Sequence, residues 1–202
     1  MIITAIKQQL KRPDRYSIFI DGKYEFSLSD AALLESKLIT GQTLTPEQVG
    51  QYKQISANDK LYNQTLRYVA LRPRSKWEIE FYLVRKKVPP PLTENILNKL
   101  SNIGLIDDEK FAEAYVNDRR LLRPASRRKL TLELRKKHIT DAIIQQAIGN
   151  EADDEQAALR AIIERKRRQT KYRDNLKLMQ YLSRQGFSYG DIKTALQDNP
   201  PD

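Results

Sequence analysis

Three stretches of similar sequence decide the fold of this chain. They read Ser75-Lys76-Trp77-Glu78-Ile79-Glu80-Phe81-Tyr82-Leu83, Ser126-Arg127-Arg128-Lys129-Leu130-Thr131-Leu132-Glu133-Leu134 and Leu178-Met179-Gln180-Tyr181-Leu182. Each stretch holds two apolar residues four positions apart, and side chains with that spacing face the same side of an α-helix. Three helices that each bury one face are therefore predicted from the pairs Ile79/Leu83, Leu130/Leu134 and Leu178/Leu182.

A second helix is predicted after each stretch, beyond a short turn. The turn is basic or contains glycine, and it is followed by an apolar residue, which is Val88, Ile139 or Phe187. The apolar positions of the second helices recur at intervals of 48 residues, which is typical of an internally repeated sequence. These positions are Ile96 and Leu100, then Ile144 and Ile148, then Ile192 and Leu196.

A leading helix precedes each of the three stretches, over residues 59–71, 107–122 and 153–168. Asp107 is a good N-cap for the second of these helices, because its side chain can accept a hydrogen bond from a backbone N–H of the first turn. The sequence therefore predicts three tandem three-helix repeats, over residues 58–106, 107–150 and 151–202.

The first 57 residues differ from the repeats and predict a small unit with β structure. Residues 18–26 hold Asp21-Gly22 between β-rich segments, which indicates a hairpin with a two-residue turn. Residues 1–10 can supply a third strand, and residues 29–38 predict a short helix. Thr45-Pro46 predicts the start of another helix, with threonine as the cap and proline at the first helical position. A hairpin alone is marginal in water, so this unit must pack against another element.

The predicted fold class is mainly α, with tandem three-helix repeats behind a small unit that contains a β-hairpin. Apolar residues make up 40% of the 202 residues and charged residues 31%. Ordinary globular chains have more apolar and fewer charged residues. A surface this large relative to the core suits an elongated, curved array of repeats better than a sphere.

The residue composition argues against an enzyme. The chain has no cysteine, one histidine, His138, and seven dispersed glycines that form no phosphate-binding loop. We therefore expect no metal, no cofactor and no catalytic residues. No run of about 18 apolar residues predicts a membrane span, and no secretory leader is recognised, so we expect a cytoplasmic protein.

The charge of the chain points to an anionic partner. Its net charge is +10, and residues 59–150 carry most of that excess, with 19 basic against 11 acidic residues. A basic excess of this size favours binding to nucleic acid or to an acidic protein face.

Three sequence runs resemble the RecX family, bacterial regulators of the RecA recombinase. They are Arg72-Pro73-Arg74-Ser75-Lys76-Trp77-Glu78, Gly104-Leu105-Ile106-Asp107-Asp108-Glu109-Lys110-Phe111-Ala112 and Tyr181-Leu182-Ser183-Arg184-Gln185-Gly186-Phe187-Ser188. The resemblance covers about residues 58–197. Residues 1–57 lie outside it, and we interpret the hairpin as an extension specific to one lineage.

The resemblance implies a non-catalytic function in DNA repair and recombination. A protein of this family would lodge in the helical groove of the RecA–single-stranded DNA filament. There it would limit filament growth, ATP hydrolysis, strand exchange and the co-protease step of the SOS response. The implied partner is the RecA filament, with single-stranded DNA inside the filament as a second candidate contact, and we expect the chain to act as a monomer.

The distribution of basic residues along the sequence indicates which residues are candidates for binding the partner. Arg127, Arg128 and Lys129 stand in the first turn of a predicted helix, where cations oppose the helix dipole and an anionic ligand would offset that cost. Basic residues also recur around the Arg-Pro starts of repeats 1 and 2 and at the ends of predicted helices. The full set is Arg72, Arg74, Lys76, Arg119, Arg120, Arg123, Arg127, Arg128, Lys129, Lys136, Lys137, Arg165, Lys166, Arg167, Arg168, Lys171 and Arg173.

Structural roles compete with binding at these positions. Cations at a helix C-terminus are ordinary capping chemistry, and a charge run is often a solvated face. Tyr172 could stack on a base beside the third-repeat cluster, or that cluster could be a solvated loop. Trp77 is expected to pack within its repeat, and His138 is expected to stand at a helix end, aligned with Lys87 and Gly186.

An alternative function is a transcriptional regulator whose three-helix units read duplex DNA as helix-turn-helix modules. A base-reading helix should expose Arg, Asn or Gln on one face. The third helices of repeats 1 and 2 carry Asn95, Asn98, Lys99, Gln145 and Gln146 but few cations. This composition argues against the alternative.

Overall fold

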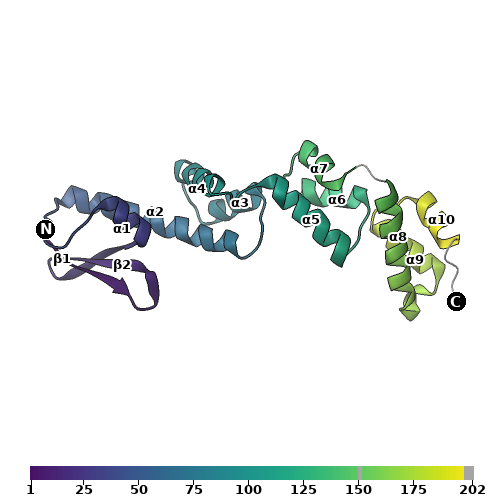
Figure 1. Cartoon of the computed structure of the whole chain (residues 1–202), viewed down its shortest axis with the longest axis horizontal. Helices are drawn as coiled ribbons and strands as arrows, with labels where there is room; N and C mark the ends of the chain where they lie inside the picture. The colour runs from purple at the N-terminus through teal and green to yellow at the C-terminus, as the bar shows by residue number, and fades with distance from the viewer. Residues whose placement is uncertain (150–151, 198–202) are drawn as a thin grey trace. The chain divides into compact units, whose positions relative to one another are not determined.

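The computed structural model describes residues 1–149 and 152–197 of the chain. A three-stranded sheet comes first, and three tandem groups of helices follow it (Figure 1). The predicted fold class of helical repeats behind a small unit with a β-hairpin is therefore confirmed. Two compact units are formed, one by Met1–Arg72 with Leu83–Leu100, the other by Pro73–Tyr82 with the chain from Ser101 onward.

The N-terminal sheet is antiparallel, in the order β1 (Ile3–Gln9), β2 (Arg12–Ile20) and β3 (Lys23–Ser29). Asp21 and Gly22 join β2 to β3 with φ angles of 48° and 79°, as a type I′ turn requires. The hairpin and the third strand predicted over residues 1–10 are both confirmed.

Two helices pack against this sheet and bury its apolar face (Figure 1). They are α1 (Asp30–Ser36), capped by Ser29, and α2 (Pro46–Ala70), which begins with a capping box of Thr45 and Gln48. Ile3, Ile18 and Leu28 of the sheet are fully buried in the resulting core. The packing partner that a marginal hairpin needs is thus supplied by the following 40 or so residues of chain.

A single helix, α2, replaces the two helices predicted over residues 46–71, and the expected start of a new helix at Asp59 is wrong. The carboxylate of Asp59 caps no helix. It accepts hydrogen bonds from Arg15 Nη1 and the Ser29 backbone N–H, each at 3.0 Å, and from the Ser29 hydroxyl and the Asn63 amide. Asp59 therefore fastens the middle of a continuous helix to the sheet.

Three-helix groups make up the rest of the fold (Figure 1). The first group combines the C-terminal part of α2 with α3 (Lys76–Arg85) and α4 (Pro90–Asn102). The second comprises α5 (Asp108–Leu122), α6 (Arg127–Arg135) and α7 (Asp141–Ile148). The third comprises α8 (Ala152–Arg167), a 3-10 turn η1 (Thr170–Tyr172), α9 (Asn175–Arg184) and α10 (Tyr189–Gln197).

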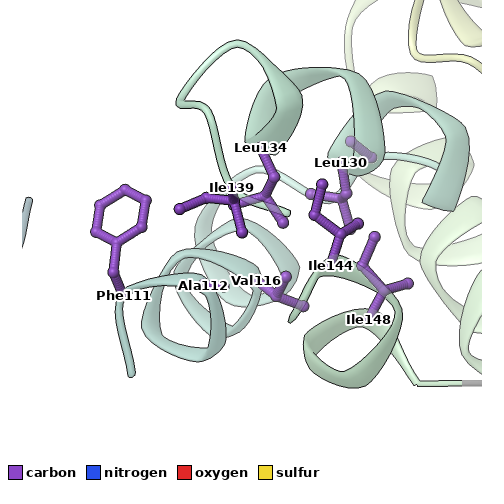
Figure 2. Close-up of a cluster of buried hydrophobic side chains, with 9 residues drawn as sticks. Phe111, Ala112, Val116, Leu130, Leu134, Ile139, Ile144 and Ile148 are labelled. Atoms are coloured by element: carbon purple, nitrogen blue, oxygen red, sulfur yellow. The ribbon is translucent and has the colours of Figure 1, made fainter. Parts of the chain in front are cut away.

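In the second and third groups, the apolar positions predicted from the repeat form the cores. In the second group, Leu130 and Leu134 of α6 meet Ile144 and Ile148 of α7 over Val116 of α5 (Figure 2). Burying a Leu or Ile side chain contributes about 1.5–3 kcal/mol, so these side chains supply most of what holds a small helical repeat together. The third group repeats the arrangement with Leu178, Leu182, Ile192 and Leu196.

The middle helix of each group ends in the same hydrogen-bond motif. Lys87, His138 and Gly186 adopt positive φ angles of 57°, 59° and 91°. The next residue donates its backbone N–H to the carbonyl five residues back, from Val88 to Leu83, from Ile139 to Leu134 and from Phe187 to Leu182. This pattern is a Schellman cap, whose two end residues are usually apolar and in contact. The predicted alignment of these three positions therefore corresponds to one shared turn.

Candidate functional site

The basic residues of α5 divide between internal and exposed positions. Arg119 donates from Nε and Nη2 to the two carboxylate oxygens of Glu133 on α6, at 2.8 and 3.0 Å. Tyr115 donates its hydroxyl to the same carboxylate, and burial together with that carboxylate raises the pKa of Tyr115. Arg119 therefore helps to hold α5 on α6. Arg120 donates to the Ile148 carbonyl at the end of α7, whereas Arg123 is exposed as the C-cap of α5.

The start of α6 is a basic first turn whose backbone is already capped. Ser126 is buried, and its hydroxyl accepts a hydrogen bond from the Lys129 backbone N–H. The Arg127 backbone N–H is bonded to Glu155 Oε1 of α8 at 3.3 Å. Because α6 has no acidic residue in its first turn, the carboxylate of the following repeat supplies the negative charge that the helix N-terminus favours. The side chain of Arg128 is exposed.

The start of α3 meets the end of α6 in a contact that we call the first junction. The Lys76 backbone N–H is bonded to Asp108 Oδ1 at 2.8 Å, and Glu78 forms an ion pair with Lys137 at 2.7 Å. The ring of Trp77 stacks on that of His138, with 4.5 Å between their centroids. Trp77 also stacks on Phe81 at 5.3 Å. The expected packing of Trp77 is thus observed, and its contact extends to the next repeat.

The start of α6 meets the end of α9 in the same way, and we call this contact the second junction. The Ser126 backbone N–H is bonded to the Gln185 carbonyl at 3.2 Å, and Lys129 Nζ donates to Gln185 Oε1 at 2.7 Å. Gly186 lies so close to α6 that a Cβ atom there would stand 2.4 Å from Ser126 Oγ. In the repeat register, Lys129 replaces Glu78 and Gln185 replaces Lys137.

A basic pocket of about 410 Å³ lies at the second junction. Four of its lining residues are the cations Arg128, Lys129, Lys136 and Arg184. One carboxylate, Glu133, also lines it, and Arg119 neutralises that charge. The rest of the wall consists of Leu132, Ser183, Gly186 and Phe187. The pocket therefore combines a surplus of positive charge with an apolar side.

The predicted basic residues around the first junction differ in how exposed they are. Lys137 is half-buried in its ion pair with Glu78, so it ties α6 to α3. Lys76 and Arg72 are exposed, whereas Arg74 is partly buried.

The cations of the third repeat surround a pair of tyrosines. Lys166 Nζ lies 4.6 Å from the ring centre of Tyr181 and 5.1 Å from that of Tyr172, and Lys171 lies over Tyr172 at 5.8 Å. Tyr172 is partly buried and packs against Tyr181. The ring that was considered as a stacking platform for a base is therefore already in contact with a second ring of the same repeat.

The other predicted basic residues of this repeat are three arginines near the end of α8 and Arg173 after it. Arg165 donates to the Leu122 carbonyl at the end of α5, and Arg167 to Asn175 Oδ1. Arg168 pairs with Glu164 one turn away, where both side chains are exposed, and such pairs contribute little to stability. Arg173 is exposed.

The structure thus brings Arg128, Lys129 and Lys136 together in one pocket and turns Arg119 and Lys137 toward other parts of the fold. Arg184 was missed by the sequence prediction. Alignment of the repeats could have found it, because Arg184 occupies in repeat 3 the position that Lys136 occupies in repeat 2.

Two kinds of site are not found in the part of the chain that the structure describes. Among residues 1–149 and 152–197, no three His, Asp or Glu side chains are grouped so that they could hold a metal ion. Within those same ranges, every helix is too short or too polar to cross a membrane.

Comparison with known protein families matches almost the whole chain, in four segments. Residues 1–45 match the regulatory protein RecX N-terminal domain, and residues 62–100 match the first RecX three-helix domain. Residues 107–148 and 153–196 match the second and third three-helix domains. The interpretation of the hairpin as an extension specific to one lineage is therefore wrong, because residues 1–45 are a domain of the family. Its short β-strands carry no motif comparable to those of the repeats.

Named relatives agree with these matches. The chain is 33% identical over 200 residues to "Regulatory protein RecX" of Listeria innocua, covering 96% of this chain and 74% of that one. It is also 33% identical to the RecX protein of Bacillus pumilus, covering 97% of this chain and 76% of the relative.

Solved structures show the same relationship. A crystal structure of regulatory protein RecX superposes with a TM-score of 0.73 at 27% identity, covering 97% of this chain and 98% of the other. A structure of RecX from Lactobacillus salivarius superposes with a TM-score of 0.57 at 28% identity, covering 70% of this chain and 95% of the other. The chain belongs to the RecX family of regulatory proteins.

Proposed function

We propose that the chain is a non-catalytic regulator of the RecA recombinase in the bacterial cytoplasm. It acts as a monomer that binds in the groove of the RecA–single-stranded DNA filament. Bound there, it mainly inhibits RecA ATP hydrolysis, strand exchange and the co-protease activity of the SOS response.

The observation that carries this proposal is the match to RecX over the N-terminal domain and all three helical repeats. The relatives that span the chain at 33% identity are named regulatory proteins. A regulator needs binding surface and no reacting groups, and the sequence carries a single histidine and no cysteine. Its net charge of +10 suits a nucleoprotein partner.

The repeated junctions support a partner that is itself periodic. The first turn of α3 and that of α6 are held in the same way by the following repeat, through Asp108 in one case and Glu155 in the other. Lys76 and Arg127, which are cations at corresponding positions of repeats 1 and 2, are therefore held in similar local settings. We propose the predicted basic residues as the contact surface, with Arg127, Arg128 and Lys136 at its centre.

The test is RecA ATPase activity on single-stranded DNA, measured as the chain is added up to a near-stoichiometric ratio. We expect the wild-type chain to lower the steady-state rate at least several-fold. The double variant Arg127→Glu and Arg128→Glu should need about tenfold more protein for the same inhibition. Lys129 is left unchanged in this variant because its ammonium group holds Gln185.

A matched control reverses two exposed cations outside the predicted set, as Arg160→Glu and Lys193→Glu. This variant changes the net charge by the same amount and should inhibit like wild type. Equal inhibition by both folded double variants would remove the start of α6 from the contact surface. Tight, sequence-specific binding to duplex DNA with no effect on RecA would contradict the proposed function and favour a transcriptional regulator.

A further inference from the structure

The two junctions are built on the same plan but are filled differently. At the first junction the rings of Phe81, Trp77 and His138 form a continuous stack, with interplanar angles of 15° and 14°. In the repeat register Leu132 takes the place of Phe81, Arg128 that of Trp77 and Gly186 that of His138. All three replacements line the pocket of about 410 Å³. The second junction is therefore hollow where the first holds stacked aromatic rings.

The chemistry of the pocket wall suits a ligand that is planar on one side and anionic on the other. Leu132 is half-exposed and offers an apolar surface, and the guanidinium group of Arg128 belongs to a type that stacks on aromatic planes. Lys129, Lys136 and Arg184 add three further positive charges. The volume lies in the range of about 300–1,000 Å³ found for small-ligand sites.

We propose that this pocket binds one nucleotide of single-stranded DNA, with the base against Leu132 and Arg128 and the phosphates among the other cations. A base in a duplex is paired and stacked, so its faces are not available to such a site, whereas single strands expose them. An acidic peptide would use the cations but would leave the apolar wall and the hollow unexplained. The inference deepens the proposed function by naming which part of the filament this pocket contacts.

The test uses the full chain with no RecA present. Fluorescence anisotropy measures binding of a short labelled oligothymidylate and of an abasic strand of the same length. We expect the oligothymidylate to bind at least about fivefold more tightly, because its bases add apolar contact with Leu132 and stacking on the Arg128 guanidinium group to the phosphate contacts that both strands make. Equal binding of the two strands would overturn the proposal.

Leu132→Asn is the decisive variant, because it removes the apolar wall against which the base lies and changes no charge. It should bring oligothymidylate binding down to the level of the abasic strand and leave abasic binding unchanged. Leu176→Asn, at an exposed leucine of α9 outside the pocket, is the matched control and should change neither affinity. A folded Leu132→Asn variant that still distinguishes the two strands as wild type does would contradict the base site.

The phosphate contacts have their own test in the salt dependence of binding. Arg184→Gln should weaken both strands and reduce the slope of log affinity against log salt by about 0.7, the value for one lost phosphate contact on a single strand. Arg160→Gln should leave the slope unchanged. A polyglutamate peptide that competes as well as oligothymidylate would show a site for acidic peptides and overturn the proposal.

Crosslinking tests the location without any substitution, which matters if Leu132→Asn fails to fold. A strand carrying 5-iodouracil should crosslink to residues 126–137 or 183–187, as mapped by mass spectrometry. Crosslinks confined to other segments would contradict the proposal. Because these assays contain no RecA, equal binding of the two strands by the wild-type chain refutes the pocket alone, and unchanged RecA activity in the ATPase assay refutes the proposed function alone.

Discussion

Asp59 shows how one buried side chain holds an element in place. Its carboxylate is 8% exposed and its partner Arg15 is 3% exposed, and their closest atoms are 3.0 Å apart. Arg15 also donates to the carbonyl and hydroxyl of Ser27, so the guanidinium group is well satisfied only while Asp59 remains. Removing one partner of a buried pair leaves the other charge without compensation.

Asp59→Ala should therefore destabilise the N-terminal sheet against α2 by about 3–5 kcal/mol. Backbone amide hydrogen exchange of β2 and β3 is the measurement, because it reports local opening without requiring that the whole chain unfold in one step. We expect protection there to fall by about two orders of magnitude or more.

The double variant Arg15→Met and Asp59→Asn is the control, because it removes both charges while the Asn carbonyl oxygen can still accept the hydrogen bonds from Ser29. It should recover most of the lost protection. Equal protection in wild type and Asp59→Ala would show that the ion pair does not hold α2 to the sheet.

The predicted cations show what residue type alone can and cannot reveal. The sequence identified Arg119 and Arg128 equally well as basic residues of repeat 2. Only the fold shows that Arg119 bonds to Glu133, which stands 14 residues later, while Arg128 lines the basic pocket. A side chain's direction depends on partners far along the chain, which local patterns do not reveal.

At the scale of elements, helix ends were predictable because caps are local. Asp107, Ser126 and Thr45 each bond to a backbone N–H within three residues, so a few letters of sequence contain the whole interaction. The helix start expected at Asp59 was wrong, and the partners that fix this residue, Arg15 and Ser29, lie 44 and 30 residues away. The junctions between repeats were unpredictable for the same reason.

Asp174 gives the C-terminal repeat a dependence on pH. Hydrogen bonds from the backbone N–H groups of Lys177 and Leu176 lower the pKa of this carboxyl below its usual 3.8. A carboxyl whose pKa is lowered by folding contributes stability above its unfolded pKa and loses it as the pH falls through the folded pKa. The contribution of this cap should therefore be complete at neutral pH and fade below about pH 4.

Asp174→Asn keeps the cap oxygen but cannot titrate, so it should stay near wild type at pH 7 and lose less stability on acidification. Asp174→Ala removes the cap and should unfold earlier at pH 7. Thermal unfolding followed by circular dichroism at pH 7 and pH 3 makes the comparison. If the melting temperature of Asp174→Asn fell between pH 7 and pH 3 by as much as that of wild type, this carboxyl would not set the acid response.

At the scale of the whole molecule, repetition links the sequence to the proposed function. The recurrence of apolar positions every 48 residues predicted the helical repeats, and the family match to three successive three-helix domains agrees with it. The same repetition produces two junctions of one design, of which one is filled with aromatic rings and the other is a basic pocket. A repeated scaffold can thus carry one specialised site without changing its fold.

The most direct test of the central claim is a cryo-electron microscopy reconstruction of RecA filaments on single-stranded DNA, prepared with the chain in slight excess. Binding in the groove predicts continuous additional density along the filament's helical groove, with the start of α6 facing the nucleoprotein. Filaments that remain bare, under conditions in which the chain lowers neither filament length nor ATPase activity, would contradict the account.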